Sequence, residues 1–267
     1  MEIEILGPLC IRESGVGVVP SAPKPRTMLA LLACQADHVV STEAVIEELW
    51  GEQVPRSAMV TVQTYVMQLR THIAAALALR GAAPDAAKSI LVTRGRGYLL
   101  ASGGGPSDLV NHDRLAETGQ AAAERGDLPE ARRLLRAALA LWRGPAIADV
   151  RLGRGLAAHA LRLEEARLSL AVQALDVELR LGNHHHVLGE LAMLTKRNPL
   201  HERLHELQML ALYRAGRREP ALRLYGRLRA TLDERLGLEP VSSVQRLHRA
   251  IVSLSPELDL VSAPIAS

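Results

Sequence analysis

One stretch, residues 41–100, constrains the fold more than any other part of the chain. It opens with Ser41 or Thr42 as a helix cap, continues with an apolar stripe and reaches Gly51 as a stop, which indicates a short amphipathic helix. A second helix is expected to begin near Ser57, after a polar turn. Its apolar residues recur at i, i+4, i+7 and i+11, which makes one inward stripe: Val62, Val66, Leu69 and Ile73.

The end of the same stretch predicts a β-hairpin. Two short β-prone runs within residues 90–100 flank glycines, which places Arg94 and Arg96 near the hairpin tip. Helix, turn, helix and hairpin in this order predict a winged helix-turn-helix. The residues that the second helix leaves off its buried stripe can bond base edges or phosphates, or touch a thymine methyl group: Thr61, Gln63, Thr64, Met67, Gln68 and Thr71.

An ordinary amphipathic helix beside an ordinary hairpin is the alternative, and periodicity alone leaves the two readings equally open. The local charge favours a nucleic-acid partner. The net charge of the chain is only +3, but residues 56–100 carry six basic residues against Asp85 alone, whereas residues 1–55 are acidic. A basic face on the recognition helix and wing is what phosphate contact needs.

The beginning of the chain predicts small strands followed by a helix. Short alternating apolar runs, broken by glycine and proline, indicate three or four antiparallel strands. A buried helix is expected from Thr27 to Cys34, with Pro25 near its first turn. Lys24 and Arg26 would then lie at the helix entry, where they could reach a phosphate. A solvated pair of charges is the equal alternative.

The composition indicates a folded, mainly helical protein of the cytoplasm. A chain of 267 residues with 48% apolar residues is long and apolar enough for two domains. Aromatic residues make up only 2%, so Leu, Ala and Val must build the core, which favours closely packed helices. Cys10 and Cys34 are far apart, and we expect both to be reduced and buried. No secretory signal or membrane-spanning run is predicted.

The second half of the chain predicts helical repeats. Gly126, Gly182 and Gly216 would each end one helix, and the next antiparallel helix starts a few residues later. The last two glycines are 34 residues apart, which is the tetratricopeptide period, and similar apolar residues follow each at the same offsets. Before these helices, Gly103-Gly-Gly-Pro within residues 101–107 predicts a hinge between the domains, with a simple continuation of the hairpin end as the alternative.

The predicted fold is therefore mainly α with small β-sheets. A winged helix-turn-helix DNA-binding domain is expected over residues 1–102, an all-α tetratricopeptide-like helical-repeat domain over 108–258, and a flexible tail over 259–267. No phosphate-binding loop, nucleophile or metal-ligand spacing occurs, and adjacent histidines at 184–186 point in different directions. We predict no enzyme, no cofactor and no metal site.

Long motifs in both halves resemble one bacterial family. Lys24-Pro-Arg before a Leu-rich helix, Thr61-Val-Gln-Thr-Tyr-Val-Met-Gln-Leu-Arg and Thr93-Arg-Gly-Arg-Gly-Tyr-Leu look like the OmpR-type winged helix. Leu139-Ala-Leu-Trp-Arg-Gly-Pro-Ala and Arg197-Asn-Pro-Leu-His-Glu-Arg-Leu look like the bacterial transcriptional activation domain. Over nearly its whole length, the chain resembles the Streptomyces antibiotic regulatory proteins.

This resemblance implies a sequence-specific DNA-binding transcriptional activator of a secondary-metabolite (antibiotic) gene cluster. It implies binding to direct repeats of double-stranded DNA near a promoter, as a dimer or as tandem protomers, and recruitment of the RNA polymerase holoenzyme. The alternative is a helical-repeat protein–protein adaptor with a structural N-terminal domain. An adaptor would need neither the basic wing nor the polar helix face.

The OmpR-type pattern also implies roles for single residues. Three are expected to face bases in the major groove: Gln63, Thr64 and Met67. Those expected at the DNA backbone or on the wing are Lys24, Arg26, Tyr65, Gln68, Arg70, Thr71, Arg94 and Arg96. The turn between the helices is expected to face polymerase through Glu52, Gln53 and Arg56, with a plain connector as the alternative. Met67 and Gln68 stand where many relatives carry a basic pair, so the wing is expected to supply more of the electrostatic grip.

Overall fold

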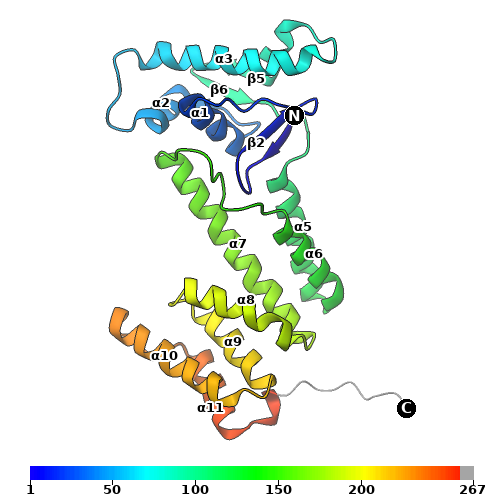
Figure 1. The fold of residues 1–267 in the computed structure, drawn as a ribbon, viewed down its shortest axis with the longest axis vertical. Coiled ribbons are helices and arrows are strands. Elements are labelled where there is room, and N and C mark those ends of the chain that lie inside the picture. The colour runs from blue at the N-terminus through cyan, green and yellow to red at the C-terminus, as the bar shows by residue number, and fades with distance from the viewer. Residues whose placement is uncertain (259–267) are drawn as a thin grey trace, which may run out of the picture. The chain divides into compact units, whose positions relative to one another are not determined.

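A computed structural model describes residues 1–258 of the chain (Figure 1). The predicted tail, 259–267, lies outside the described residues. The fold is mainly α with small antiparallel sheets, as the sequence predicts. The chain forms two compact units, each described here by itself. The N-terminal unit comprises residues 1–116 and 137–168, and the C-terminal unit comprises 117–136 and the described residues from 169 onward.

A small antiparallel sheet begins the N-terminal unit. Its strands are β1 (Glu2–Glu4), β2 (Cys10–Glu13) and β3 (Val16–Gly17), in the order β1-β2-β3. Ile3 pairs with Ile11, and both side chains are buried because alternate residues of a strand face the core. The expectation of small antiparallel strands is confirmed.

The first helix, α1 (Pro23–Cys34), begins four residues before the predicted start at Thr27. Ala22 is extended and Pro23 occupies the first helical position, where its fixed φ suits a helix and its missing N–H costs nothing. Cys34 is half-buried rather than fully buried, and burial raises the pKa of its thiol to about 12. Because α1 begins at Pro23, Lys24 and Arg26 lie within its first turn rather than ahead of it.

The helix-turn-helix follows the predicted pattern closely. In α2 (Thr42–Trp50), the Ser41 hydroxyl accepts a hydrogen bond from the Ala44 N–H at 3.0 Å, and Gly51 ends the helix with φ of 56°. The next helix, α3 (Ala58–Ala78), buries the predicted stripe: Val62, Val66, Leu69 and Ile73. Figure 1 shows α3 along the outer edge of this unit, over α1, α2 and the hairpin.

A second antiparallel sheet carries the wing. Its strands are β4 (Val40–Ser41), β5 (Leu91–Arg94) and β6 (Gly97–Leu100), in the order β4-β6-β5. The predicted hairpin is present, but its first strand starts at Leu91. Ile90 instead ends a short helix, α4 (Ala87–Ile90), which follows the 3-10 turn η1 (Pro84–Ala86). No local pattern in the sequence predicted this helical turn.

Residues 101–107, predicted to be a hinge, are fastened to the rest of the N-terminal unit. Ile3 donates its N–H to the Pro106 carbonyl at 2.9 Å. Ser102 donates its hydroxyl to the Asp37 carboxylate at 2.6 Å and its N–H at 2.9 Å, and these bonds lower the pKa of Asp37. The segment lies inside the N-terminal unit rather than between the two units, so it is not the hinge between them that the sequence suggested. Of its glycines, Gly105 lies where a Cβ would overlap the Met1 backbone, whereas Gly103 and Gly104 have positive φ.

Residues 137–168 complete the core of the winged helix. After α5 (Asp108–Glu124) and α6 (Leu128–Ala140), the chain returns along β1 and α1, and Arg143 donates its N–H to the Leu6 carbonyl at 2.8 Å. The residues of this returning segment that enter the core are Trp142, Ala146, Ile147, Val150, Leu156 and Leu163. The domain predicted over residues 1–102 thus shares its core with a segment assigned to the second domain, and the predicted boundaries stay a prediction.

A buried carboxylate, that of Glu48 in α2, fixes the end of the returning segment. Its exposed fraction is 7%, and its two oxygens accept backbone N–H groups from Gly153 at 2.6 Å, Gly155 at 2.8 Å and Leu156 at 3.1 Å. These groups surround the N-terminus of α7 (Arg154–Arg180), where the helix dipole also favours a negative charge. Three donors offset the cost of burying the carboxylate.

The C-terminal unit continues in helices after the last part of α7. They are α8 (His184–Arg197), α9 (Glu202–Arg214), α10 (Arg218–Leu236) and α11 (Ser242–Ser253), followed by the 3-10 turn η2 (Pro256–Leu258). The predicted helix-ending glycines, Gly126, Gly182 and Gly216, have φ of 80°, 84° and 72°. None of the helices described within residues 1–258 is both long and apolar enough to cross a membrane.

Charged hydrogen bonds join three helices of this unit. Glu178 is buried, which opposes its ionisation, but bonds from Asn183 and Arg132 lower the pKa of its carboxyl group. Arg136 bonds Glu178 at 3.3 Å and also Glu190 at 2.8 Å. The carboxylates of α7 and α8 therefore share one arginine of α6.

We expect Glu48→Gln to lower the free energy of unfolding by roughly 2–3 kcal/mol, because an amide NH₂ would face backbone N–H donors. Urea unfolding of the full chain measures this. Glu47→Gln is the matched control: Glu47 is exposed, and its pair with Arg154 spans 3.9 Å, so its loss should change little. Equal stability of the two variants would show that the buried bonds contribute nothing.

Candidate nucleic-acid interface

The outermost line of α3 is composed of Val60, Thr64, Met67 and Thr71. Each lies two residues before a member of the buried stripe, which is about 200° around the helix. Val60 and Met67 are 64% and 68% exposed. The predicted base contacts Gln63, Thr64 and Met67 are thus all exposed on α3, and Thr71 lies on the outermost line itself.

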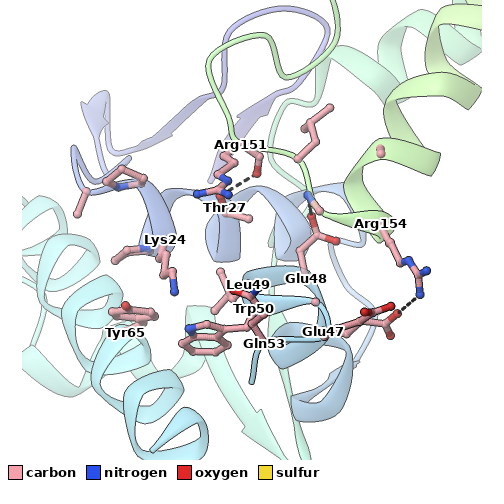
Figure 2. Close-up of a pocket in the computed structure, with 18 of the residues that line it drawn as sticks. Lys24, Thr27, Glu47, Glu48, Leu49, Trp50, Gln53, Tyr65, Arg151 and Arg154 are labelled. Carbon is pink, nitrogen blue, oxygen red and sulfur yellow. Dashed lines mark hydrogen bonds and ion pairs between the residues drawn. The ribbon is translucent and has the colours of Figure 1, made fainter. Parts of the chain in front are cut away.

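Tyr65 and Gln68 face the other side of α3 and line a cavity of about 1330 Å³ (Figure 2). The cavity lies wholly within the N-terminal unit. Its remaining walls come from the start of α1, the end of α2, the turn that follows α2, and residues 151–157. Tyr65 is half-buried against the core, so less of it is available to DNA than of Gln68.

Arg70, predicted to contact the DNA backbone, is occupied by the wing. Its Nε and Nη2 atoms donate to the Leu91 carbonyl at 3.0 and 2.8 Å, and Nη2 also donates to the Thr93 hydroxyl at 2.9 Å. Leu91 and Thr93 belong to β5. The guanidinium therefore sets the position of the wing against α3, a role that no sequence signal revealed.

The wing carries the exposed cations of the interface. Arg94 is exposed and forms no ion pair within the described part of the chain, and Arg96 is 88% exposed with Glu43 at 3.4 Å. Thr42 holds the tip by donating its N–H and hydroxyl to the Arg96 carbonyl, both at 2.9 Å. Gly97 must lack a side chain, because a Cβ there would overlap the backbone of β4.

Two predicted phosphate contacts at the start of α1 have partners in the structure. The Lys24 ammonium lies 4.5 Å from the centroid of the Trp50 ring, over its face (Figure 2). Arg26 donates from Nε to the Pro20 carbonyl at 3.0 Å and pairs with Asp149 at 3.1 Å. The Arg26 guanidinium thus fastens α1 to the returning segment, and Lys24 is the freer of the two cations.

The turn between α2 and α3 presents polar side chains to solvent. Glu52, Gln53 and Arg56 are all exposed, and Glu52 and Gln53 also form one edge of the cavity beside Trp50. The loop is therefore an accessible surface next to α3, as its predicted role requires. Its contact with polymerase stays a prediction.

The candidate interface also includes residues that the sequence did not single out. Val60 is as exposed as Met67 and lies on the same line, and the phase of the buried stripe could have shown it. The residues 151–154 that line the cavity could not have been found, because they come from a distant part of the chain.

Across residues 1–258, no three His, Cys, Asp or Glu side chains are grouped to hold a metal ion.

Comparison with known proteins identifies the two halves. Residues 17–100 match the family profile of the transcriptional regulatory protein C-terminal domain, and residues 107–252 match that of the bacterial transcriptional activator domain. The chain is 44% identical over 259 residues to Regulatory protein DnrI of Streptomyces peucetius, covering 97% of this chain and 94% of the relative. The chain belongs to the Streptomyces antibiotic regulatory protein family. It is a transcriptional activator, and its relatives are regulatory proteins.

Other relatives are longer and match nearly the whole of this chain. Transcriptional regulator RedD of Streptomyces coelicolor is 35% identical over 98% of this chain and 73% of the relative. Regulatory protein AfsR of the same species is also 35% identical over 98% of this chain, which spans only 25% of AfsR. A solved structure of Mycobacterium tuberculosis EmbR, in complex with a low affinity phosphopeptide, matches with a TM-score of 0.86 and 30% identity. The match covers 96% of this chain and 65% of EmbR.

We expect Arg70→Ala to lower the free energy of unfolding by about 1–2 kcal/mol, because it leaves the Leu91 carbonyl without its charged donor. Arg80→Ala is the control: Arg80 is exposed just beyond the end of α3. Urea unfolding of both variants measures the difference. If Arg70→Ala is no less stable than Arg80→Ala, Arg70 does not brace the wing.

Proposed function

We propose that this protein activates a secondary-metabolite (antibiotic) gene cluster by binding direct repeats of double-stranded DNA near a promoter and recruiting the RNA polymerase holoenzyme. The observation that carries the proposal is the pairing of an uncharged, exposed face of α3 with a cationic wing. Arg70 braces one against the other, so base reading and phosphate gripping have a fixed geometry.

The proposed docking places α3 in the major groove and the wing at the neighbouring minor groove or backbone. Gln63, Thr64 and Met67 contact bases, and Gln68 and Thr71 lie nearer the groove edge. Arg94 and Arg96 supply most of the electrostatic grip, with Lys24 as a further cation. Arg26 and Arg70 add to the positive electrostatic potential but make no direct phosphate contact, because their guanidinium groups already have protein partners.

Binding to direct repeats has a consequence for assembly. Protomers on direct repeats face the same way along the DNA, so any contact between them joins two different surfaces of the chain. We propose tandem protomers, or a head-to-tail dimer, on the duplex. The C-terminal unit offers helical surfaces for this contact or for polymerase.

Mutations on the wing and on α3 should distinguish phosphate contacts from base recognition. Arg94→Ala and Arg96→Ala should each weaken binding to every duplex, because each arginine is proposed to neutralise one phosphate. Each variant should reduce the slope of log affinity against log salt concentration by about 1. Arg70→Ala should reduce this slope by less than either wing variant, because its guanidinium bonds β5 rather than a phosphate. Gel-shift titrations at several salt concentrations measure the slopes. Salt-independent affinity, or no binding to any promoter in the gene neighbourhood, would refute the proposed function.

In the same assays, Gln63→Ala should relax base preference at one position with a nearly unchanged salt slope. A glutamine amide bonded to both polar atoms of an adenine edge discriminates by roughly 1–3 kcal/mol. Single-base variants of the footprinted repeat measure this preference. If every preference survives Gln63→Ala, the proposed orientation of α3 is wrong even if the protein binds DNA.

The turn between α2 and α3 is proposed to contact polymerase through Glu52, Gln53 and Arg56. All three are exposed on the turn rather than on the outermost line of α3, and Glu52 and Gln53 lie at the cavity, so a partner could reach them while α3 occupies DNA. Replacing Glu52 and Gln53 with Ala should reduce transcription in vitro severalfold while duplex affinity stays level. If transcription also stays level, the turn is a plain connector.

A further inference from the structure

The outermost line of α3 offers a major groove almost no hydrogen-bond donors. Thr64 donates its hydroxyl to the Val60 carbonyl and Thr71 donates to the Met67 carbonyl, each at 3.0 Å. Each threonine hydroxyl proton is therefore committed to its own helix. What remains on this line is the side chains of Val60 and Met67, together with methyl groups and acceptor lone pairs of the two threonines.

This apolar line would be unfavourable on a helix that met only water. The exposed fractions of Val60 and Met67 are 64% and 68%, and neither residue packs against the core described for this unit. On the major-groove edges of the four base pairs, the thymine C5-methyl is the apolar group that projects. An apolar side chain placed there gains by removing both surfaces from water.

We propose that Val60 and Met67 read thymine methyl groups, and that Val60 is a specificity-determining residue of the recognition helix. This inference rests on the proposed docking of α3 in the major groove. Val60 lies one turn before Gln63 and Thr64 on the helix surface. Gln63 can therefore bond an adenine edge while Val60 contacts the methyl of the same or the adjacent A·T pair.

Other occupants of this line fit less well. A protein partner seated on it would have to leave when α3 enters DNA, because the same residues face the bases. A phosphate would find no cation on this line, since its four residues are uncharged and the nearby Arg70 bonds β5. The flanking amides and the cationic wing both suit a duplex.

The experiment removes single methyl groups from DNA. In the footprinted repeat, each thymine is replaced in turn by deoxyuridine, which keeps all hydrogen bonds and lacks only the methyl. For the unmodified protein, at least one replacement should weaken binding about fourfold, the effect of burying one methyl-sized group. With Val60→Ala or Met67→Ala, the penalty at the matching thymine should fall to near zero.

Val110→Ala is the matched control. Val110 is 67% exposed on α5, so it loses the same atoms from an equally exposed site, and its deoxyuridine penalties should equal those of the unmodified protein. Unfolding curves confirm that the variants fold, which exposed positions permit. If no deoxyuridine replacement weakens binding, or if the penalties persist in both α3 variants, the methyl-reading proposal is overturned and the DNA-binding function stands. Failure to bind the parent duplex overturns both.

Discussion

The buried carboxylate of Glu48 is the contact on which the arrangement of the N-terminal unit depends. It connects α2, the first helix of the helix-turn-helix, to three backbone N–H groups at the start of α7, more than 100 residues away. Gly153 and Gly155 are required there because a Cβ at either position would meet Glu48. The same helix carries Trp50 and leads into the turn proposed to face polymerase, so this carboxylate indirectly positions a surface of the proposed function.

Two arginines predicted from the sequence to contact the DNA backbone also hold the fold together. Arg26 fastens α1 to Asp149 in the returning segment, and Arg70 fastens β5 to α3. Arginine suits this work because its planar fork can donate to more than one acceptor at once. In the proposed docking, the electrostatic contacts to phosphate therefore fall mainly on Arg94 and Arg96, and α3 would read base edges with uncharged groups.

The buried stripe of α3 and its exposed outermost line follow the same helical periodicity. The stripe that begins at Val62 and the line that begins at Val60 have the same spacing, two residues out of phase, so they lie on nearly opposite sides of α3. Burial of the stripe fixes the rotation of the helix about its axis. In the proposed docking, that rotation decides which side chains reach the groove, so a change in the buried stripe would turn the outermost line of α3 away from the DNA without altering any residue on it.

The sequence by itself determined the elements whose causes are local. Ser41 as a cap, Gly51 as a stop, the inward stripe of α3 and the helix-ending glycines Gly182 and Gly216 follow from bonds and torsions within a few residues. Only the tertiary structure decided which charges are free and what completes the core. The Arg70 bonds span 21 residues and those of Glu48 more than 100, and the segment 101–107 that resembles a hinge is pinned by a distant aspartate. Periodicity records which face of a helix is buried but not which segment buries it, because that partner is chosen by packing between parts remote in the chain.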